Sequence, residues 1–151
     1  MIDDAIRARS RVLAHLVGLV LLLLLFAVAV ELAAVIRGRL GADYLALRLP
    51  LPFFLWAIWN VRMMILAAGQ SGGHDAALGP LLGRVGFALF LGGIASVFGV
   101  PLLLRLRHGN GGLAAYDVAA ITLGVVGLAL ILVAHLLGQA AAMRAELDEI
   151  V

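Results

Sequence analysis

Four polar side chains interrupt long apolar stretches of this sequence and form the first candidate site. Glu31 lies late in the first apolar run, Asn60 and Arg62 lie together in the second, and Asp117 lies early in the last. Charged groups are costly inside a bilayer, so those that occur there often line ion paths or ligand sites. The four residues therefore predict a ligand-binding or polar cluster.

Glu31 and Asp117 are expected at a similar depth, near the end of the bundle that lies away from the chain termini. Arg105, Arg107 and His108 approach the same depth, so we expect arginine to neutralise the carboxylates. One interpretation is a site that responds to protons or cations. The alternative is charge pairing at the membrane surface that fixes the register of the helices.

Arg62 is the deepest of these charges. It is about 12 Å from the end of its apolar run at the rise of an α-helix, and an arginine side chain can snorkel over such a distance. The alternatives are a side chain that reaches water, or one that binds Glu31 or an anionic ligand.

His15 and His135 form the second candidate site. His15 lies near the start of the first apolar run and His135 near the end of the last, so a four-helix arrangement places both near the termini. Gly18 and Gly138 each follow one of these histidines by three residues. Two histidines at one depth on different helices are a ligand set for the iron of haem b. The alternative is two interfacial histidines that hydrogen-bond to water or lipid headgroups, with no cofactor.

The sequence offers no catalytic set and no metal-binding set. Cysteine is absent, and the hydroxyl residues Ser10, Ser71, Ser96 and Thr122 lie outside any nucleophile-elbow pattern. The glycine-rich segment 109–112 lacks the lysine of a phosphate-binding loop. The sequence therefore favours a protein without enzyme activity, leaves an enzyme that acts on lipid as the open alternative, and indicates no metal centre.

Composition places these side chains in a membrane protein. Of the 151 residues, 64% are hydrophobic and 13% are charged, against roughly 45–50% and about 25% in soluble domains. Lipid is the solvent that accommodates such an excess of apolar surface. The formal net charge of +2 comes from arginines that are spread along the chain without a basic patch, so we expect no direct nucleic-acid binding.

Four apolar runs are long enough to cross a bilayer, which takes about 20 residues. The sequence predicts an all-α polytopic membrane protein, a four-transmembrane-helix bundle forming one domain over residues 1–151, with spans at about 12–36, 51–68, 82–104 and 113–138. Residues 139–151 extend the last helix as an amphipathic segment. A signal peptide cleaved near 27–29 is the competing interpretation of the first run, which is long for such a peptide.

The third run is rich in small residues. Gly92 and Ser96 are four residues apart, as are Ala95 and Gly99, and this spacing lets helix backbones approach closely in lipid. We therefore expect the third helix to be the most enclosed one. The alternative is that glycine is simply a common residue of membrane helices.

The orientation of the bundle is poorly determined by charge. Five arginines lie on the side of the termini, namely Arg7, Arg9, Arg11, Arg84 and Arg144. Five lie on the other side, namely Arg37, Arg39, Arg48, Arg105 and Arg107. The positive-inside rule therefore does not decide. We expect a multi-pass protein of the inner (plasma) membrane with cytoplasmic termini.

Two stretches carry a family resemblance. Residues 77–86 read Ala-Leu-Gly-Pro-Leu-Leu-Gly-Arg-Val-Gly, and residues 146–151 read Glu-Leu-Asp-Glu-Ile-Val. With its four spans, the chain resembles the bacterial membrane family called domain of unknown function 2975, although its second loop carries few charges. The resemblance implies no catalytic residue. Members often neighbour small helix-turn-helix regulators, so it also implies a membrane partner that senses or sequesters a regulator, with the tail in the cytoplasm.

Three functions are compatible with these features. The first is a sensor, regulator or accessory subunit that acts by contact with a protein partner or a second copy. The second is a small oligomeric transporter or channel-like carrier that uses Glu31, Arg62 and Asp117. The third is a b-type haem protein ligated by His15 and His135. Because no catalytic set is present, the first is favoured.

Overall fold

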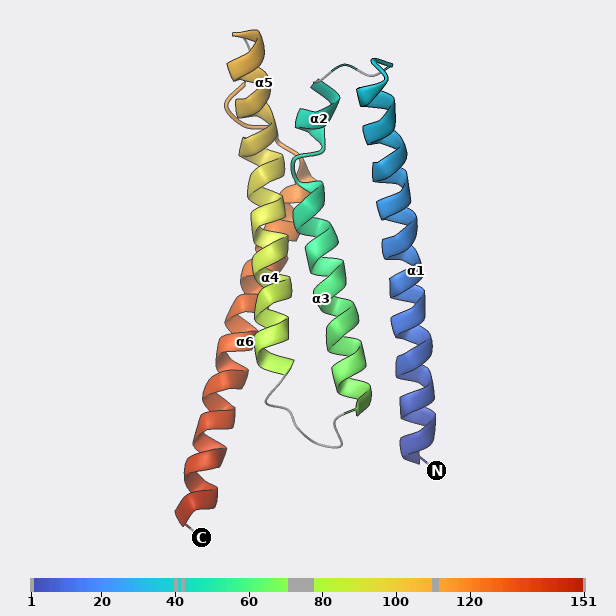
Figure 1. Ribbon diagram of the computed structural model, residues 1–151. Helices are drawn as coiled ribbons and strands as arrows, with labels where there is room; N and C mark the ends of the chain where they lie inside the picture. The colour runs from blue at the N-terminus through green and yellow to red at the C-terminus, as the bar shows by residue number, and fades with distance from the viewer. Residues whose placement is uncertain (1, 40, 42, 71–77, 110–111, 151) are drawn as a thin grey trace.

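The computed structural model describes residues 2–39, 41, 43–70, 78–109 and 112–150. These residues form helices that are connected by short loops (Figure 1). The elements in chain order are α1 (Ile2–Ile36), α2 (Asp43–Leu47), α3 (Leu51–Gln70), α4 (Leu78–Ile94), the π-helix η2 (Ala95–Gly99), α5 (Val100–His108) and α6 (Val118–Ile150). The predicted all-α bundle is confirmed, and α6 continues through the predicted extension to Ile150. Residues 71–77 of the predicted second loop lie outside the described residues.

Within the described residues, four helical segments are long and apolar enough to cross a membrane. They are Ser10–Ile36, Asp43–Ala68, Leu78–His108 and Val118–Arg144. Large apolar side chains along them are exposed, as with Leu22 at 65% and Phe26 at 67%, which suits lipid and not water. The chain is therefore a multi-pass membrane protein. Its two termini lie at the same end of the bundle (Figure 1), as four spans require.

The spans lie side by side in an open arrangement. α1 packs against α3, α3 packs against α4, and α4 makes its most extensive contact with α6. α1 and α6 lie on opposite sides of the bundle in the half that carries the termini (Figure 1). The span that contains α4 is 28% buried, whereas the others are 6% or 11% buried. The prediction that the third span is the most enclosed one is confirmed.

Glycines bring the backbones of α4 and α6 into direct contact. A Cβ atom added to Gly86 would lie 2.6 Å from the carbonyl oxygen of Gly127, and one added to Gly127 would lie 2.6 Å from the carbonyl oxygen of Gly86. About two turns further along α4, a Cβ atom on Gly93 would lie 2.9 Å from the Cα atom of Gly124. Real Cβ atoms do not approach other atoms so closely. The closest crossing in the bundle therefore depends on these glycines, and not on the Gly92–Ser96 or Ala95–Gly99 pairs that the sequence indicated.

The other side of α4 packs against α3 through aromatic rings. A Cβ atom on Gly92 would lie 2.5 Å from the ring of Phe54, so this glycine makes room for the phenylalanine. The rings of Trp56 and Phe87 meet edge to face with their centroids 6.4 Å apart. Such aromatic pairs contribute beyond the area that they bury.

The third span is interrupted by the π-helix η2, next to Pro101. Proline has no N–H, so the carbonyl of Val97 lacks the donor that an α-helix supplies four residues later. The N–H of Ala115, in the loop before α6, donates to the Val97 oxygen at 2.8 Å. This hydrogen bond connects the loop before α6 to the third span. α6 begins at Val118, whereas the predicted span began at Leu113.

Candidate functional site

The end of the bundle away from the termini is held by an ion pair between α1 and the segment after α2. Nη2 of Arg48 donates to Oε1 of Glu31 at 2.5 Å and to the hydroxyl of Tyr44 at 3.2 Å. The guanidinium also lies over the ring of Tyr44, 5.2 Å from its centroid. Tyr44 lies in α2 and Arg48 directly follows it, so the arginine connects this short helix to Glu31 at the end of α1.

A second ion pair ties α2 to the end of α5. Oδ1 of Asp43 lies 3.1 Å from Nε of Arg107 and 3.0 Å from Nε2 of His108, and the second contact is ionic only when the imidazole is protonated. Arg107 and His108 lie in the last turn of α5, where cations complement the helix dipole. Ion pairs thus connect three helices at this end: Arg48 joins the α2 segment to α1, and Asp43 joins α2 to α5.

The sequence predicted carboxylates neutralised by arginine at this end, and for Glu31 the structure shows such a pair. The partner is Arg48, from a stretch that the sequence indicated only as loop. Arg107 and His108 contact Asp43, and not Glu31 or Asp117. The sequence analysis did not predict the short helix α2. The four-residue spacing of Tyr44 and Arg48 is the signal that could have indicated it.

Asp117 does not join this cluster. Its Oδ1 accepts hydrogen bonds from the N–H groups of Ala119 at 3.0 Å and Ala120 at 3.4 Å, so Asp117 is the N-cap of α6. The carboxylate also lies at the positive end of the helix dipole. Among the described residues Asp117 and Glu31 thus make separate contacts: one caps a helix and the other binds Arg48.

Replacing Asp117 with alanine should lower the free energy of unfolding by about 1 kcal/mol, because two N–H groups of α6 lose their acceptor. Asp117→Asn keeps the accepting oxygen and should cost less. Denaturation of the purified protein in detergent, followed by circular dichroism, measures both. Equal losses for the two variants would contradict the capping role.

Asn60 is buried within α3 and bonded locally. It is 5% exposed, and its Nδ2 donates to the backbone oxygen of Trp56 at 2.7 Å. This hydrogen bond uses one of the two N–H groups of the amide within its own helix.

Arg62 projects from α3 onto α1. A Cβ atom on Gly18 would lie 3.1 Å from Nε of Arg62, so the absence of a side chain at Gly18 gives the arginine its place. The guanidinium lies 5.7 Å from the ring centroid of Trp59, one turn earlier on α3. Its Nε is buried and has no hydrogen-bond partner. Among the described residues Arg62 pairs with no carboxylate; Glu31 is bound elsewhere, by Arg48.

His15 and His135 are not brought together within one chain. Nδ1–H of His15 donates to the backbone oxygen of Arg11 at 2.6 Å, and Nε2 of His135 lies 3.2 Å from the side-chain amide nitrogen of Gln139. Both side chains are exposed, and their helices α1 and α6 lie on opposite sides of this half of the bundle (Figure 1). The two imidazoles therefore do not fit one haem iron in this chain.

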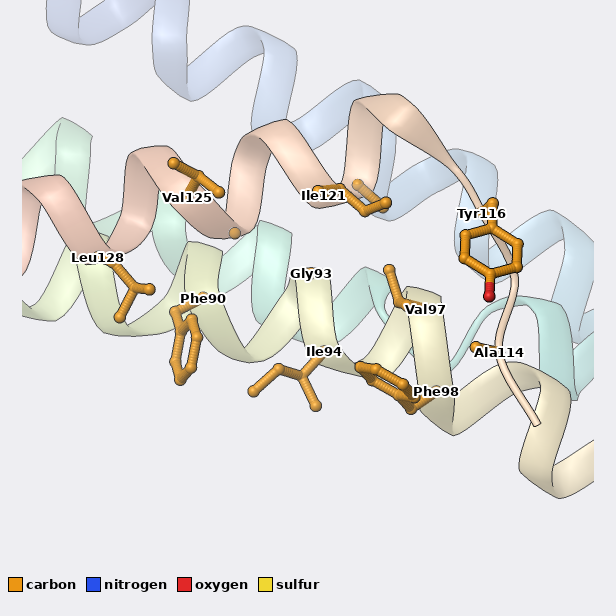
Figure 2. Close-up of a pocket in the computed structure, with 12 residues that line it drawn as sticks. Phe90, Gly93, Ile94, Val97, Phe98, Ala114, Tyr116, Ile121, Val125 and Leu128 are labelled. Atoms are coloured by element: carbon orange, nitrogen blue, oxygen red, sulfur yellow. The ribbon is translucent and has the colours of Figure 1, made fainter.

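Two apolar grooves open on the surface of the bundle. The first, of about 390 Å³, lies between α6 and the α4–η2 segment (Figure 2). Gly93 lies at its base, Phe90, Ile94 and Phe98 lie along one side, and the hydroxyl of Tyr116 lies at one end. The second, of about 540 Å³, is formed by α1, α3 and α4 with one residue of α6, and we call it the α1–α3–α4 groove. The second lies within the spans, whereas the first extends to Ala114 and Tyr116 in the loop before α6.

The remaining predictions about chemistry concern metals and carriers. Among the described residues no group of three or more histidine, aspartate or glutamate side chains converges on a possible metal position. The charges invoked for a carrier are dispersed: Glu31 binds Arg48, Asp117 caps α6, and Arg62 lies against α1 at Gly18. Their placement gives the carrier no support.

Comparison with known proteins adds no relative to this description. No family model, no curated protein and no solved structure matches the chain.

Proposed function

We propose that this chain is a small non-enzymatic membrane protein that acts by contact, as a sensor, regulator or accessory subunit. The observation that carries the proposal is the exposure of α1. Only 6% of the residues in its most apolar stretch are buried. Its packing against α3 within the span includes a strip at Ala14, Gly18 and Leu21, and Glu31 adds the ion pair to Arg48 at the far end. The opposite face of this helix is free to pack against another transmembrane helix.

That face is well defined by helical periodicity. Leu19, Leu23 and Phe26 lie away from the strip that contacts α3, and all three are more than half exposed. Helices associate in lipid through packing and not through the hydrophobic effect. One face of α1 packs against α3 and the other is exposed. The exposed face therefore suits a partner helix, from a second copy of this chain or from another protein.

The proposal extends to the termini. α6 continues as a helix beyond the end of its span at Arg144, to Ile150. This extension carries the acidic residues Glu146, Asp148 and Glu149. If the chain lies in the inner (plasma) membrane with its termini in the cytoplasm, the extension would meet a soluble regulator while α1 contacts a membrane partner.

A photo-crosslinking amino acid in place of Phe26 tests the proposal. We expect a single protein adduct in intact cells, recovered at a constant ratio to the chain, because Phe26 faces outward from α1. The matched control is the same amino acid in place of Ala88, which is 0% exposed at the centre of the bundle. An adduct at twice the chain's mass would identify a second copy as the partner. Adducts with lipid only, at both Leu19 and Phe26, would refute action through this face.

A further inference from the structure

We propose that Arg62 and the α1–α3–α4 groove form a binding site for one phospholipid of the leaflet nearer the termini. In this site the phosphate binds the guanidinium of Arg62 and one acyl chain lies in the groove. The proposal does not depend on the contact function above, because it rests on Arg62 and on the groove side of α1 at Leu16, Val17 and Val20.

The guanidinium is fixed in place but incompletely bonded. Gly18 leaves space for it, and Trp59 lies beneath it at 5.7 Å. Its buried Nε has no acceptor, and no described carboxylate pairs with it. A guanidinium binds the oxygens of a phosphate two at a time through its planar set of N–H donors. An anion with several oxygens would supply acceptors for the remaining N–H groups of the guanidinium.

The depth of Arg62 in the membrane favours a lipid over a soluble anion. Arg62 contacts α1 at Gly18, and the middle of the span Ser10–Ile36 is at Leu23. At the rise of an α-helix Gly18 is about 7 Å from the middle of the span, and half of the hydrocarbon core is about 15 Å. The phosphate layer is therefore within reach of the arginine side chain, which extends toward it by snorkelling. A soluble anion would have to enter hydrocarbon to reach Arg62.

The groove runs beside the turn of each helix that carries Gly18 or Arg62, although neither of these two residues lines it. Val17 and Val61, the neighbours of Gly18 and Arg62 in their helices, both line it. It continues along α3 to Phe54, which is about 10 Å from Val61 along the helix. The wall on α4 is Val85 and Leu89. A cation at the head and an apolar channel that runs from it toward the membrane centre match the two parts of a phospholipid.

Native mass spectrometry of the full chain tests this arrangement. The protein is exchanged into detergent with a dioleoyl phosphatidylglycerol, or with dioleoylglycerol, which has the same acyl chains and no phosphate. We expect one retained phosphatidylglycerol per chain, with retention about tenfold above that of dioleoylglycerol. Arg62→Gln should abolish the preference and Arg62→Lys should reduce it, whereas Arg84→Gln, an exposed arginine on the same side, should leave it unchanged.

A second pair of variants tests the groove without touching the cation. Val20→Trp places a large ring in the groove and should displace the lipid. Leu22→Trp adds the same ring on the other side of α1, outside the groove, and should have no effect. Far-ultraviolet circular dichroism of each variant confirms that it is folded.

Three results would overturn the proposal. They are equal retention of the two lipids by the unmodified chain, unchanged retention in Val20→Trp, and displacement of the phospholipid by inorganic phosphate. The last would assign the site to a soluble anion. None of them bears on the crosslinks expected from Phe26, so failure here is distinguishable from failure of the contact function.

Discussion

Gly86→Ala should lower the free energy of unfolding of the bundle by about 1–3 kcal/mol, the usual cost of overpacking a close contact. The added methyl group would lie 2.6 Å from the carbonyl oxygen of Gly127 and 2.9 Å from the backbone nitrogen of Ile131. Backbone atoms of a helix cannot rotate away as the end of a side chain can. α4 and α6 must therefore move apart along the most extensive contact of the structure. Gly127→Ala meets the same obstacle from the other side and should cost a similar amount.

Other glycines of the same two helices provide matched controls. A Cβ atom on Gly83 would lie 3.5 Å from the Cβ atom of Ala134, which is an ordinary contact, and one on Gly138 would meet nothing within 4 Å. Because alanine favours helix over glycine, these two substitutions should be neutral or stabilising, by up to about 1 kcal/mol. Titration with sodium dodecyl sulfate, followed by the helical signal in circular dichroism, gives the comparison. If Gly86→Ala behaved like Gly138→Ala, the direct backbone contact would be refuted.

Arg48→Ala is the second substitution with a large expected effect, again about 1–3 kcal/mol. It removes the hydrogen bonds to Glu31 and Tyr44 and the contact of the cation with the tyrosine ring. The carboxylate of Glu31 is 30% exposed, so it would keep part of its solvation and the loss stays below that of a fully buried pair. The same denaturant titration measures the loss.

A double-mutant cycle separates this pair from general effects of charge. Glu31→Gln, Arg48→Ala and the double variant should show a coupling free energy of about 1 kcal/mol. Arg105→Ala removes an exposed arginine at the same end of the bundle and should change stability by less than about 0.5 kcal/mol. A coupling free energy of zero would mean that α2 is held to α1 by packing alone.

The four spans were predictable because their cause is composition. A run of apolar residues about as long as the bilayer is thick has no other stable environment, whatever its neighbours are. The enclosure of the third span was predictable for a similar reason, since glycine serves close packing in lipid. Which glycines make that contact was not. Gly86 and Gly93 face α6 because of the direction in which α6 crosses α4, and a single sequence does not contain that direction.

The candidate site was predicted less well than the fold. Glu31 was expected to bind arginine, but the choice of Arg48 depends on α2, which is too short to stand out in a hydropathy pattern. Asp117 followed by an apolar run fits a helix cap as well as a charge inside a span, and only the later start of α6 separates the two. The pairing of His15 with His135 assumed that helices at the two ends of the chain close a ring. The open arrangement of the spans removes that assumption.

The extensive contact between α4 and α6 joins two spans that are consecutive along the chain. A hairpin of adjacent spans closes a short loop, so the order in which the protein assembles follows from this contact. After insertion, the second half of the polypeptide is expected to pair first and to present a finished surface to α3. α1 packs against α3, its neighbour along the chain, through the smallest of the contacts between consecutive spans. α1 is therefore the span that a faulty molecule is expected to release first.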